Sequence, residues 1–592
     1  MCDTLSDGTQ FRAASVPSDP GISSRSINRD SVVVLDHEAD WDHTADVVVI
    51  GTGIAGCTTA FDCLRRGLSV VMLEKGTATG GTSAKAAGGM LVPNNRYLQE
   101  LGQDDPREDF IRFLARVGRP LLYDASDDFF GLPEWEYRLI ETYYDHAAEA
   151  FAHMADTGAM RVEHQPDWSS YNDLPEDKRR FGRVLFNVDD DGAMVNGRPV
   201  IDRLTAMICE RGGRVLTEHR VDGVFLNRAA EVVGVRASHA GRTVLARAHR
   251  AVAFASGGFT HGERWVREYL NGMYVGGCAA RTNEGDLIPI AKALGIPLIN
   301  MHSAWGAPLL YEQALDRDPA LIANFSLMGD SSFSVNAHGV RVTNEKTTYN
   351  DRTQSHFRWD PRKAEYPDFL QFAIFDERTR RLWPKAGLAD HQAGNFIPPI
   401  GETSKYLMEA DTLAELAAAI DGRLAALSAQ SGGVRLSEDF LDNLRATIAR
   451  FNEFARTGVD QDFHRGETTI ELFMHGARAD DNDLPNPTLH PLADRGPYYA
   501  AILAPGSIET KGGPKVNQRL QMLDGEERPV VGLYGIGNCV ASPSGQAYWS
   551  GGSTFGPYVT FGYVAAQSIS QEPQKVLGGG GAPAPHAMPT GA

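Results

Sequence analysis

The chain has 592 residues, with 57 Lys or Arg against 76 Asp or Glu, so its formal net charge at neutral pH is −19. Hydrophobic residues make up 42% and charged residues 22%, which is typical of a globular protein with a large buried core. No apolar run is long enough for a membrane-spanning helix, and an acidic chain without basic blocks is a poor nucleic-acid binder. The six cysteines show no CxxC spacing, so we predict no metal site.

The two ends of the chain differ in composition from the rest. Residues 1–44 are rich in Ser, Asp, Arg and Gly without apolar periodicity, so we predict a flexible leader. Residues 574–592 contain GGGGAPAPHAMPTGA and are predicted to form a flexible tail. Because the N-terminus lacks the apolar core of a signal peptide, we expect a cytoplasmic protein.

The ordered body opens with a strand–helix–strand unit over residues 46–75. DVVVI predicts a buried strand, helical spacing follows, and SVVML predicts a second buried strand that ends at Glu74. Gly51, Gly53 and Gly56 form GxGxxG between the first strand and the helix, where glycines permit a tight turn and a close approach of the backbone to a diphosphate. Glu74 stands where an acid accepts hydrogen bonds from ribose, so this unit predicts a dinucleotide site.

Further glycine-rich segments follow along the chain. GTATGGTSAKAAGGMLVPNN at 76–95 offers two Gly pairs whose backbone suits a flat ring system, and VAFASGGF at 252–259 ends a strand in another Gly pair. Near the other end, GLYGIGN and GGSTFGPYVTFGYVAAQSI predict a strand, a Gly turn and an apolar helix. Helices are also predicted over 412–429 and 437–457.

These stretches together resemble the flavoproteins of the fumarate reductase/succinate dehydrogenase group, and within it the FAD-dependent 3-ketosteroid dehydrogenases. The matching runs include VVVIGTGIAG, EKGTATGGTSAKAAGGM, NEGD, GVRVTNEKTTY, PGSIETKGGP and YWSGGSTFGPYVTFGYVAA, in the same order over about 46–573. The resemblance implies an α/β fold with a Rossmann-like FAD-binding domain built from both chain ends (45–300 and 495–573). An inserted α+β substrate domain then occupies 301–494.

The resemblance also implies the residues that hold FAD. Some members of the group attach flavin through a histidine, and Thr82 stands at that position here, so we expect non-covalent FAD. The cofactor-binding residues implied are Gly51, Gly53, Ile54, Ala55, Gly56, Glu74, Lys75, Gly81, Thr82, Ser83, Ala87, Gly88, Gly89, Val221, Ala255, Ser256, Gly257, Asp286, Gly537, Asn538, Ser553 and Thr554.

The chain departs from the fumarate reductases where those enzymes hold dicarboxylates. Tyr349 replaces the arginine that carries the proton, Glu509-Thr510-Lys511 replaces a His-Thr-x run, and Tyr548 replaces a second arginine. Losing two guanidiniums and a histidine disfavours an anionic substrate at this position, whereas tyrosines suit a neutral carbonyl compound.

Resemblance to the ketosteroid dehydrogenases implies four catalytic residues. Tyr548 and the N–H of Gly552 donate hydrogen bonds to the ketone, and Tyr349 takes the neighbouring proton. Tyr171, in PDWSSYND, is the candidate that supports this base, with Trp168 as the alternative because the register departs from the family pattern. An ordinary tyrosine titrates near ~10, so Tyr349 needs a lowered pKa or a relayed proton.

The sequence therefore predicts FAD-dependent dehydrogenation of a 3-ketosteroid at the bond next to the ketone, with C1–C2 as the expected position. A 4-ene-forming enzyme and a flavin reductase of another activated alkene stay open as alternatives. Because no second nucleotide motif is present, a quinone-type acceptor is expected rather than NAD. The oligomeric state is left open.

Overall fold

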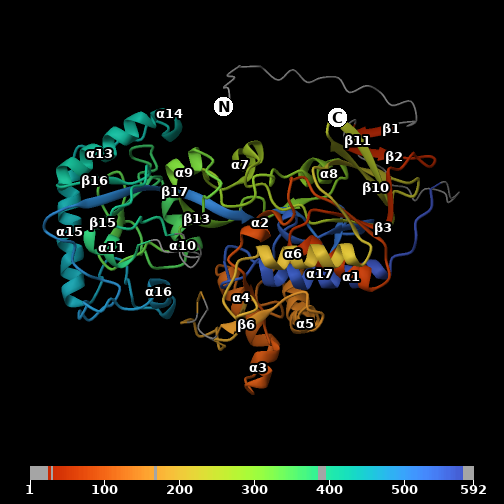
Figure 1. Cartoon of the computed structure of the whole chain (residues 1–592), viewed down its shortest axis with the longest axis horizontal. Helices are drawn as coiled ribbons and strands as arrows, with labels where there is room; N and C mark the ends of the chain where they lie inside the picture. The colour runs from red at the N-terminus through yellow and green to blue at the C-terminus, as the bar shows by residue number, and fades with distance from the viewer. Residues whose placement is uncertain are drawn as a thin grey trace.

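The computed structural model describes residues 25–28, 31–165, 170–171, 173–179, 181–384 and 395–577. Trp168, residues 1–24 of the expected leader and residues 578–592 of the expected tail lie outside this description. Figure 1 shows two parts, one around a large sheet and one around a smaller sheet, with strand β17 running from the second part toward the first.

The large sheet has ten strands and is assembled from both ends of the chain. β3 pairs in parallel with β4 and with β11, and β11 pairs in parallel with the late strand β20. This confirms the predicted Rossmann-like arrangement. The order is β1 (Arg25–Asn28), β2 (Val32–Val34), β9 (Arg220–Leu226), β10 (Val232–His239), β11 (Arg242–Phe254), β3 (His43–Ile50), β4 (Val70–Leu73) and β8 (Arg214–Leu216), with β20 (Pro529–Gly535) on β11 and β19 (Gln521–Leu523) on β20.

Part of the expected flexible leader belongs to this sheet, so that prediction was wrong for β1, β2 and the first residues of β3. β2 pairs in parallel with β9, and Val32 is 1% exposed. The reason is the local apolar run from Val32 to Leu35, which is long enough to bury one strand although the leader as a whole is polar.

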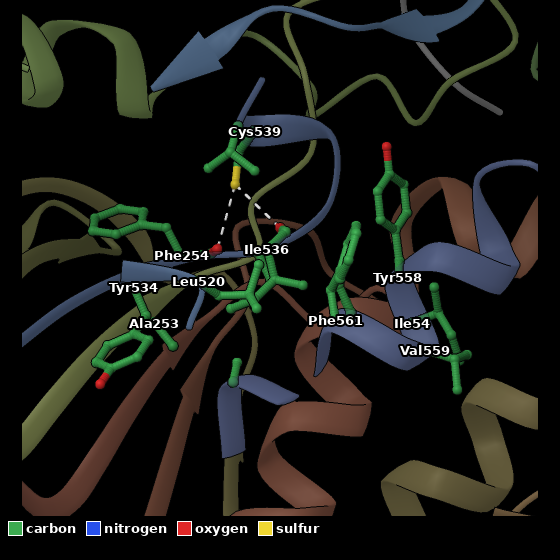
Figure 2. Packing of buried hydrophobic residues seen from close by; sticks show 14 of the residues in the cluster. Ile54, Ala253, Phe254, Leu520, Tyr534, Ile536, Cys539, Tyr558, Val559 and Phe561 are labelled. Atoms are coloured by element: carbon green, nitrogen blue, oxygen red, sulfur yellow. Dashed lines mark hydrogen bonds between the residues drawn. The ribbon is translucent and has the colours of Figure 1, made fainter. Parts of the chain in front are cut away.

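Helices α1 (Ile54–Arg65) and α17 (Phe555–Ser570) pack against each other beside the large sheet. Figure 2 shows Ile54, Val559 and Phe561 from these helices in one apolar cluster with residues at the ends of β11 and β20. In the same view the Cys539 thiol donates to the carbonyl oxygens of Phe254 and Ile536, both at 3.3 Å. These contacts join segments from the N-terminal and C-terminal parts of the chain at the carboxyl edge of the parallel strands.

The second sheet contains five strands and carries its own apolar core. α13 and α15, predicted from sequence, pack on it through Leu416, Ile420 and Phe451. β17 belongs to this sheet, so residues 498–510 were wrongly placed in the FAD-binding domain. The strands are β13 (Ala304–Leu310), β17 (Tyr498–Thr510), β15 (Gln371–Asp376), β14 (Ser332–Val335) and β16 (Met408–Ala410), and the helices are α13 (Leu413–Ala426) and α15 (Phe440–Thr457).

Two small sheets and several shorter helices complete the described residues. None of the helices within those ranges is both long and apolar enough to cross a membrane. The small sheets join β5 (Gly89–Leu91), β7 (Val184–Asn187) and β6 (Val162–Gln165), and β12 (Leu298–Ile299) and β18 (Gly513–Pro514). The remaining helices are α2 (Gly81–Lys85), α3 (Arg96–Glu100), α4 (Arg107–Gly118), α5 (Glu134–Asp156), α6 (Arg198–Glu210), α7 (Glu263–Tyr269), α8 (Leu287–Ala293), α9 (Tyr311–Leu315), α10 (Tyr349–Gln354), α11 (Glu377–Leu382), α14 (Ser428–Ser431) and α16 (Thr469–His475).

Candidate cofactor and active site

A long cleft lies at the carboxyl ends of the parallel strands β3, β4, β11 and β20, the edge at which α/β sheets bind ligands. Most of the residues predicted to bind the cofactor line it. They are Gly51, Gly53, Ile54, Ala55, Glu74, Lys75, Gly81, Thr82, Ser83, Val221, Ala255, Ser256, Gly257, Asp286, Gly537 and Asn538.

The glycine turn at the start of α1 is shaped for a diphosphate. Gly51 has φ +97°, and a side chain on it would collide with the Ala255 carbonyl. A side chain on Gly56 would collide with the Gly51 carbonyl, so both positions require glycine. Gly53 has no side chain to cap α1, so apart from the N–H of Ile54, which donates to Ser83 Oγ, the first-turn N–H groups and the positive dipole end are directed at the cleft.

Glu74 organises two loops of the cleft through its buried carboxylate. One oxygen accepts from the N–H and the hydroxyl of Thr52 at 3.0 and 2.6 Å, and the other accepts from the N–H of Gly76 at 2.7 Å. The Thr52 hydroxyl in turn accepts from the N–H of Gly80 at 2.9 Å. Thr52 was not predicted, because its role depends on this contact rather than on the glycine spacing.

An ion-pair chain closes the Glu74 end of the cleft. Lys75 lies 2.8 Å from Asp286, which also pairs with Arg220 at 2.6 Å. Asp286 precedes α8 but makes no side-chain cap bond within the described residues, so its observed contacts are these two cations.

Helix α2 brings two hydroxyl groups against the cleft. Ser83 Oγ accepts from the N–H of Ile54 at 3.0 Å, and Thr82 Oγ1 accepts from the N–H of Ala280 at 2.9 Å and from Asn283 Nδ2 at 3.0 Å. Asn283 lines the cleft and also donates to the buried carboxylate of Glu509. The NEGD run contains Asn283, but sequence alone did not distinguish it from its neighbours.

Six predicted cofactor residues lie behind the cleft lining. Gly56 packs on the Gly51 carbonyl, and a side chain on Gly88 would meet the Val195 carbonyl. Gly89, in β5, pairs with Phe186 of β7. Ser553 exchanges hydrogen bonds with Ser550, and Thr554 stands at the start of α17. The sixth, Ala87, lies between α2 and β5. Their direct contact with a cofactor stays a prediction.

Tyr558 is a cleft residue that the sequence analysis missed. It lies one turn into α17 and its hydroxyl donates to Asn538 Oδ1 at 2.5 Å. Burial raises the pKa of Tyr558 well above the ordinary tyrosine value, so it is a neutral donor. The apolar helix pattern around it gave no signal of this role.

Two tyrosines distant in sequence meet at the junction of the two sheets. Tyr349 opens α10 and Tyr548 lies in the loop before α17, with their ring centres 5.2 Å apart at 58°. They are 9% and 7% exposed. Burial raises the pKa of both phenols, and the neighbouring Tyr548 phenol raises the pKa of Tyr349 further. A resident phenolate at Tyr349 would require a lowered pKa, whereas the surroundings of Tyr349 raise its pKa.

Gly552 lies against strand β5 in a conformation that requires glycine. Its φ is +79°, and a side chain there would collide with the backbone of Gly89 and Met90. Its carbonyl accepts from the N–H of Leu91 at 3.2 Å. The structure thus fixes Gly552 four residues after Tyr548, beside the segment that follows α2.

Tyr171 reaches the same region through Asp351. Its hydroxyl donates to Asp351 Oδ1 at 3.2 Å, and Thr348 donates to the other oxygen at 2.9 Å. Burial, followed by the charge of Asp351, raises the pKa of Tyr171 well above its ordinary value. Tyr171, Thr348 and Asp351 therefore form a polar network at the start of α10, the helix that Tyr349 opens.

Lys511 is a buried cation that sequence reasoning singled out without giving it a role. Its ammonium group donates to the carbonyls of Gly545 and Ala547, both at 3.1 Å, and it lies 5.5 Å from the Trp305 ring centre. Burial lowers the pKa of Lys511 to about 7, although the charge of Asp351 opposes this. Lys511 thus holds the loop that carries Tyr548.

The arginine nearest to Tyr349 in sequence is bound elsewhere. Arg352, one turn along α10, donates to the Glu345 carbonyl at 2.6 Å and to Asn324 Oδ1 at 2.9 Å. It braces the segment before α10, while phenols occupy the positions at which the resemblance places substrate-binding arginines.

Comparison with known proteins identifies the family of this chain. Residues 46–555 match the model of the FAD binding domain family. The chain belongs to the FAD binding domain family. This family member is 30% identical to the 4-oxocyclohexanecarboxylate 2-dehydrogenase of Sinomonas cyclohexanicum, over 89% of this chain and 93% of that protein. It is also 30% identical to the 3-oxosteroid 1-dehydrogenase of Mycobacterium tuberculosis, over 90% of this chain and 99% of that protein.

The fold of this family member matches a solved ketosteroid dehydrogenase. The structure of the 3-ketosteroid delta1-dehydrogenase from Sterolibacterium denitrificans superposes with a TM-score of 0.74 and 22% identity, over 89% of this chain and 99% of that one. FAD is therefore the cofactor, and the protein is a flavin-dependent dehydrogenase. The glycine turn, the start of α1 and the cleft fit FAD.

Proposed function

We propose that the protein dehydrogenates a 3-ketosteroid at the bond next to the ketone, at C1–C2. The observation that carries this proposal is the pairing of Tyr349 with Tyr548, 5.2 Å apart between ring centres, with Gly552 fixed four residues further on. The M. tuberculosis relative, a 3-oxosteroid 1-dehydrogenase, supports it.

Tyr548 and Gly552 would polarise the ketone. Burial keeps the Tyr548 phenol protonated, so its hydroxyl can donate to the ketone oxygen together with the N–H of Gly552. Two such donors stabilise the enolate that forms when the neighbouring carbon loses its proton. A neutral phenol donates well because a dry site strengthens its hydrogen bond.

Tyr349 would accept that proton while giving up its own. The two phenol rings lie 5.2 Å apart between their centres, so a proton that arrives at the Tyr349 oxygen could displace the Tyr349 proton toward the neighbouring phenol without a resident phenolate. Of the two possibilities that the sequence left open, a lowered pKa and a relayed proton, we propose the relay. Tyr171 and Asp351 offer the exit, because the Tyr171 hydroxyl already donates to the partly exposed Asp351 carboxylate.

FAD, when bound, supplies the hydride acceptor for the second carbon of the bond. The α1 N-terminus would hold its diphosphate, Glu74 and Val221 would lie at one end, and Asn538 and Tyr558 at the other. A quinone-type compound is the proposed final acceptor, because the chain has one GxGxxG motif.

A second candidate is a small cyclic keto acid. It is favoured by the S. cyclohexanicum relative, whose name specifies 4-oxocyclohexanecarboxylate, at the same 30% identity. The same tyrosine pair would serve, since both compounds present a ring ketone. A fumarate-type dicarboxylate is disfavoured because Tyr349 and Tyr548 occupy the positions of the expected arginines.

A substrate panel scored by dye reduction tests the proposal. Androst-4-ene-3,17-dione should reduce the dye and lose two hydrogens at C1 and C2, whereas succinate should give no reaction. A double bond at C4–C5 from a saturated 3-ketosteroid would replace the proposed position, and turnover of succinate alone would overturn the proposal.

A further inference from the structure

Among the described residues, Glu509 carries a buried carboxyl group with no cation at ion-pair distance. It lies near the end of β17 and is 0% exposed. Two other buried acids, Asp105 and Glu345, instead pair with Arg183 at 2.8 Å and with Arg341 at 2.9 Å. Because a buried carboxylate without a countercharge is costly, the environment of Glu509 favours a group that can also become neutral.

Neutral groups hold this carboxyl in one orientation. The Thr260 hydroxyl donates to Oε1 of Glu509 at 2.5 Å, and the N–H of Thr510 donates to the same oxygen at 3.0 Å. Asn283 Nδ2 donates to the other oxygen, Oε2. An asparagine amide carries both a donor and an acceptor, so Asn283 can also accept from Oε2 once that oxygen is protonated. The same neighbours therefore suit the carboxylate and the carboxylic acid.

A single layer of residues separates the Glu509 carboxyl from the cofactor cleft. Asn283 lines the cleft and donates at 3.0 Å to Thr82 Oγ1, and Thr82 lines the cleft as well. A side chain on Gly257, a third lining residue, would come within 2.6 Å of the Asn283 amide nitrogen. One on Gly258 would come within 2.6 Å of Glu509 Oε1. The carboxyl group therefore lies directly behind this wall of the cleft.

From Glu509 the chain continues toward the end of the cleft proposed for the flavin. A side chain on Gly513 would meet the carbonyl of Cys539, the residue after Asn538 in the cleft lining. After burial, the charge of Glu509 is the next cause that raises the pKa of Tyr558, which donates to Asn538. Since Asn538 and Tyr558 lie at the end opposite the ribose, the Glu509 carboxyl stands beside the part that would hold the flavin.

We propose that Glu509 binds one proton from solvent when a hydride enters the flavin, and releases it when the electrons leave. A hydride adds one negative charge to the site, and a nearby carboxylate repels that charge strongly in surroundings of low dielectric constant. Conversion of the carboxylate to the carboxylic acid adds one positive charge, so the net charge of the site is unchanged. The inference concerns the FAD site and does not depend on which ketone is oxidised.

Other ionisable groups on the surrounding segments decide how the test is designed. Burial raises the pKa of Glu509 above the ordinary glutamate value, against the opposing hydrogen bonds from Thr260 and Asn283. Lys511, two residues along the chain, has a pKa lowered by burial to about 7 and so also titrates near neutrality. Only the difference between the wild type and a variant without the Glu509 carboxyl therefore isolates this group. The other ionisable groups on these segments are Lys75, Lys85, His261, Cys278, Arg281, Glu284, Asp286 and Tyr558.

The test measures the two-electron reduction potential of the FAD-loaded wild type and Glu509→Gln between about pH 5.5 and 9. Over part of this range the extra proton should make the wild-type reduction equilibrium constant fall by a further tenfold per pH unit, ~30 mV. Glu509→Gln should lack this steep part, and the two potentials should converge at the acid end. Glu263→Gln, which removes an exposed carboxylate three residues after Thr260, is the control and should follow the wild type.

Parallel pH profiles of the wild type and Glu509→Gln, coincident or offset, would overturn the inference, because Glu509 would then keep one protonation state through reduction. Flavin fluorescence titration should show FAD affinity within about threefold of the wild type. If Glu509→Gln loses FAD, Thr260→Val decides instead. Loss of the Thr260 donor disfavours the carboxylate, so the steep part should extend to higher pH, and an unmoved profile would overturn the inference. The potentials are measured without any ketone, so failure of the proposed function is seen separately.

Discussion

Two side chains from elsewhere in the chain donate hydrogen bonds to consecutive backbone carbonyls of the loop before Tyr548. Lys511 donates to the carbonyls of Gly545 and Ala547, and Asn350 donates to the carbonyl of Gln546, each at 3.1 Å. Three consecutive carbonyls are thus fixed although the loop has no regular structure. Because Asn350 is the neighbour of Tyr349, the same contacts set one phenol relative to the other.

Lys511→Met should change how stability depends on pH. The folded pKa of about 7 lies below the unfolded value, so the unfolded chain binds more protons between about pH 7 and 10 and stability rises with pH there. The variant should lose this rise, which amounts to a few kcal/mol in order of magnitude. Urea unfolding of both proteins at pH 7 and pH 9.5 measures the difference; parallel curves would show that Lys511 keeps an ordinary pKa.

Gly552→Ala should reduce turnover strongly while FAD remains bound. The new methyl group would collide with the Gly89 and Met90 backbone at φ +79°, which displaces the N–H proposed to face the ketone. We expect kcat to fall about 100-fold. Gly401→Ala is the matched control, since it has φ +89° with open space around it, and an equal loss in both variants would mean that backbone strain alone is responsible.

Several residues of the site were within reach of sequence reasoning and others were not. Tyr349 and Tyr548 stood out because each replaces an arginine of a related motif. Thr52, Asn283 and Tyr558 act through contacts with Glu74, Thr82 and Asn538, and those contacts exist only after folding. Motif spacing predicts backbone geometry well and side-chain partners poorly.

The α1–α17 crossing links both ends of the chain at the cofactor cleft. The start of α1 is the predicted diphosphate-binding terminus, and α17 follows the loop that carries Tyr548. The spacing between the two helices therefore sets the position of the cofactor site relative to Tyr548. A side chain on Gly562 would come within 2.9 Å of Thr58 Cβ and 3.0 Å of the Ala55 carbonyl. Glycine there allows the helices to approach closely.

Gly562→Val should therefore destabilise the protein by about 1–3 kcal/mol and weaken FAD binding, because the helices must separate. Urea unfolding and flavin fluorescence titration measure the two effects. Gly422→Ala in α13 is the control, since nothing lies within 4 Å of that position, and it should be neutral or stabilising. An unchanged FAD affinity in Gly562→Val would show that the crossing does not position the α1 terminus.

Patterns within elements explain which strands were predicted. β4 and the last residues of β3 and β11 are buried apolar runs, and the helices α13 and α15 carry clear periodicity. β2 was missed because three valines were read together with a polar leader. β17 is buried along almost its whole length, so its sequence does not reveal which of the two sheets it joins, and only its partners β13 and β15 do.

Across the whole molecule, the two sheets converge on one polar junction. The large sheet supplies the FAD cleft, and the smaller one supplies Tyr349 through α10, which packs on β13. The loop before α17 brings Tyr548 to the same place, so the site exists only when both parts are assembled. This explains why no single segment of the sequence carries the activity.

The most direct test is an anaerobic mixing experiment on FAD-loaded wild type, Tyr349→Phe and Tyr548→Phe. A cyclic ketone should bleach the flavin of the wild type, and each variant should bleach at least about 100-fold more slowly with an unchanged FAD content. Bleaching at the wild-type rate in both variants would contradict the assignment of the tyrosine pair as the ketone-activating groups.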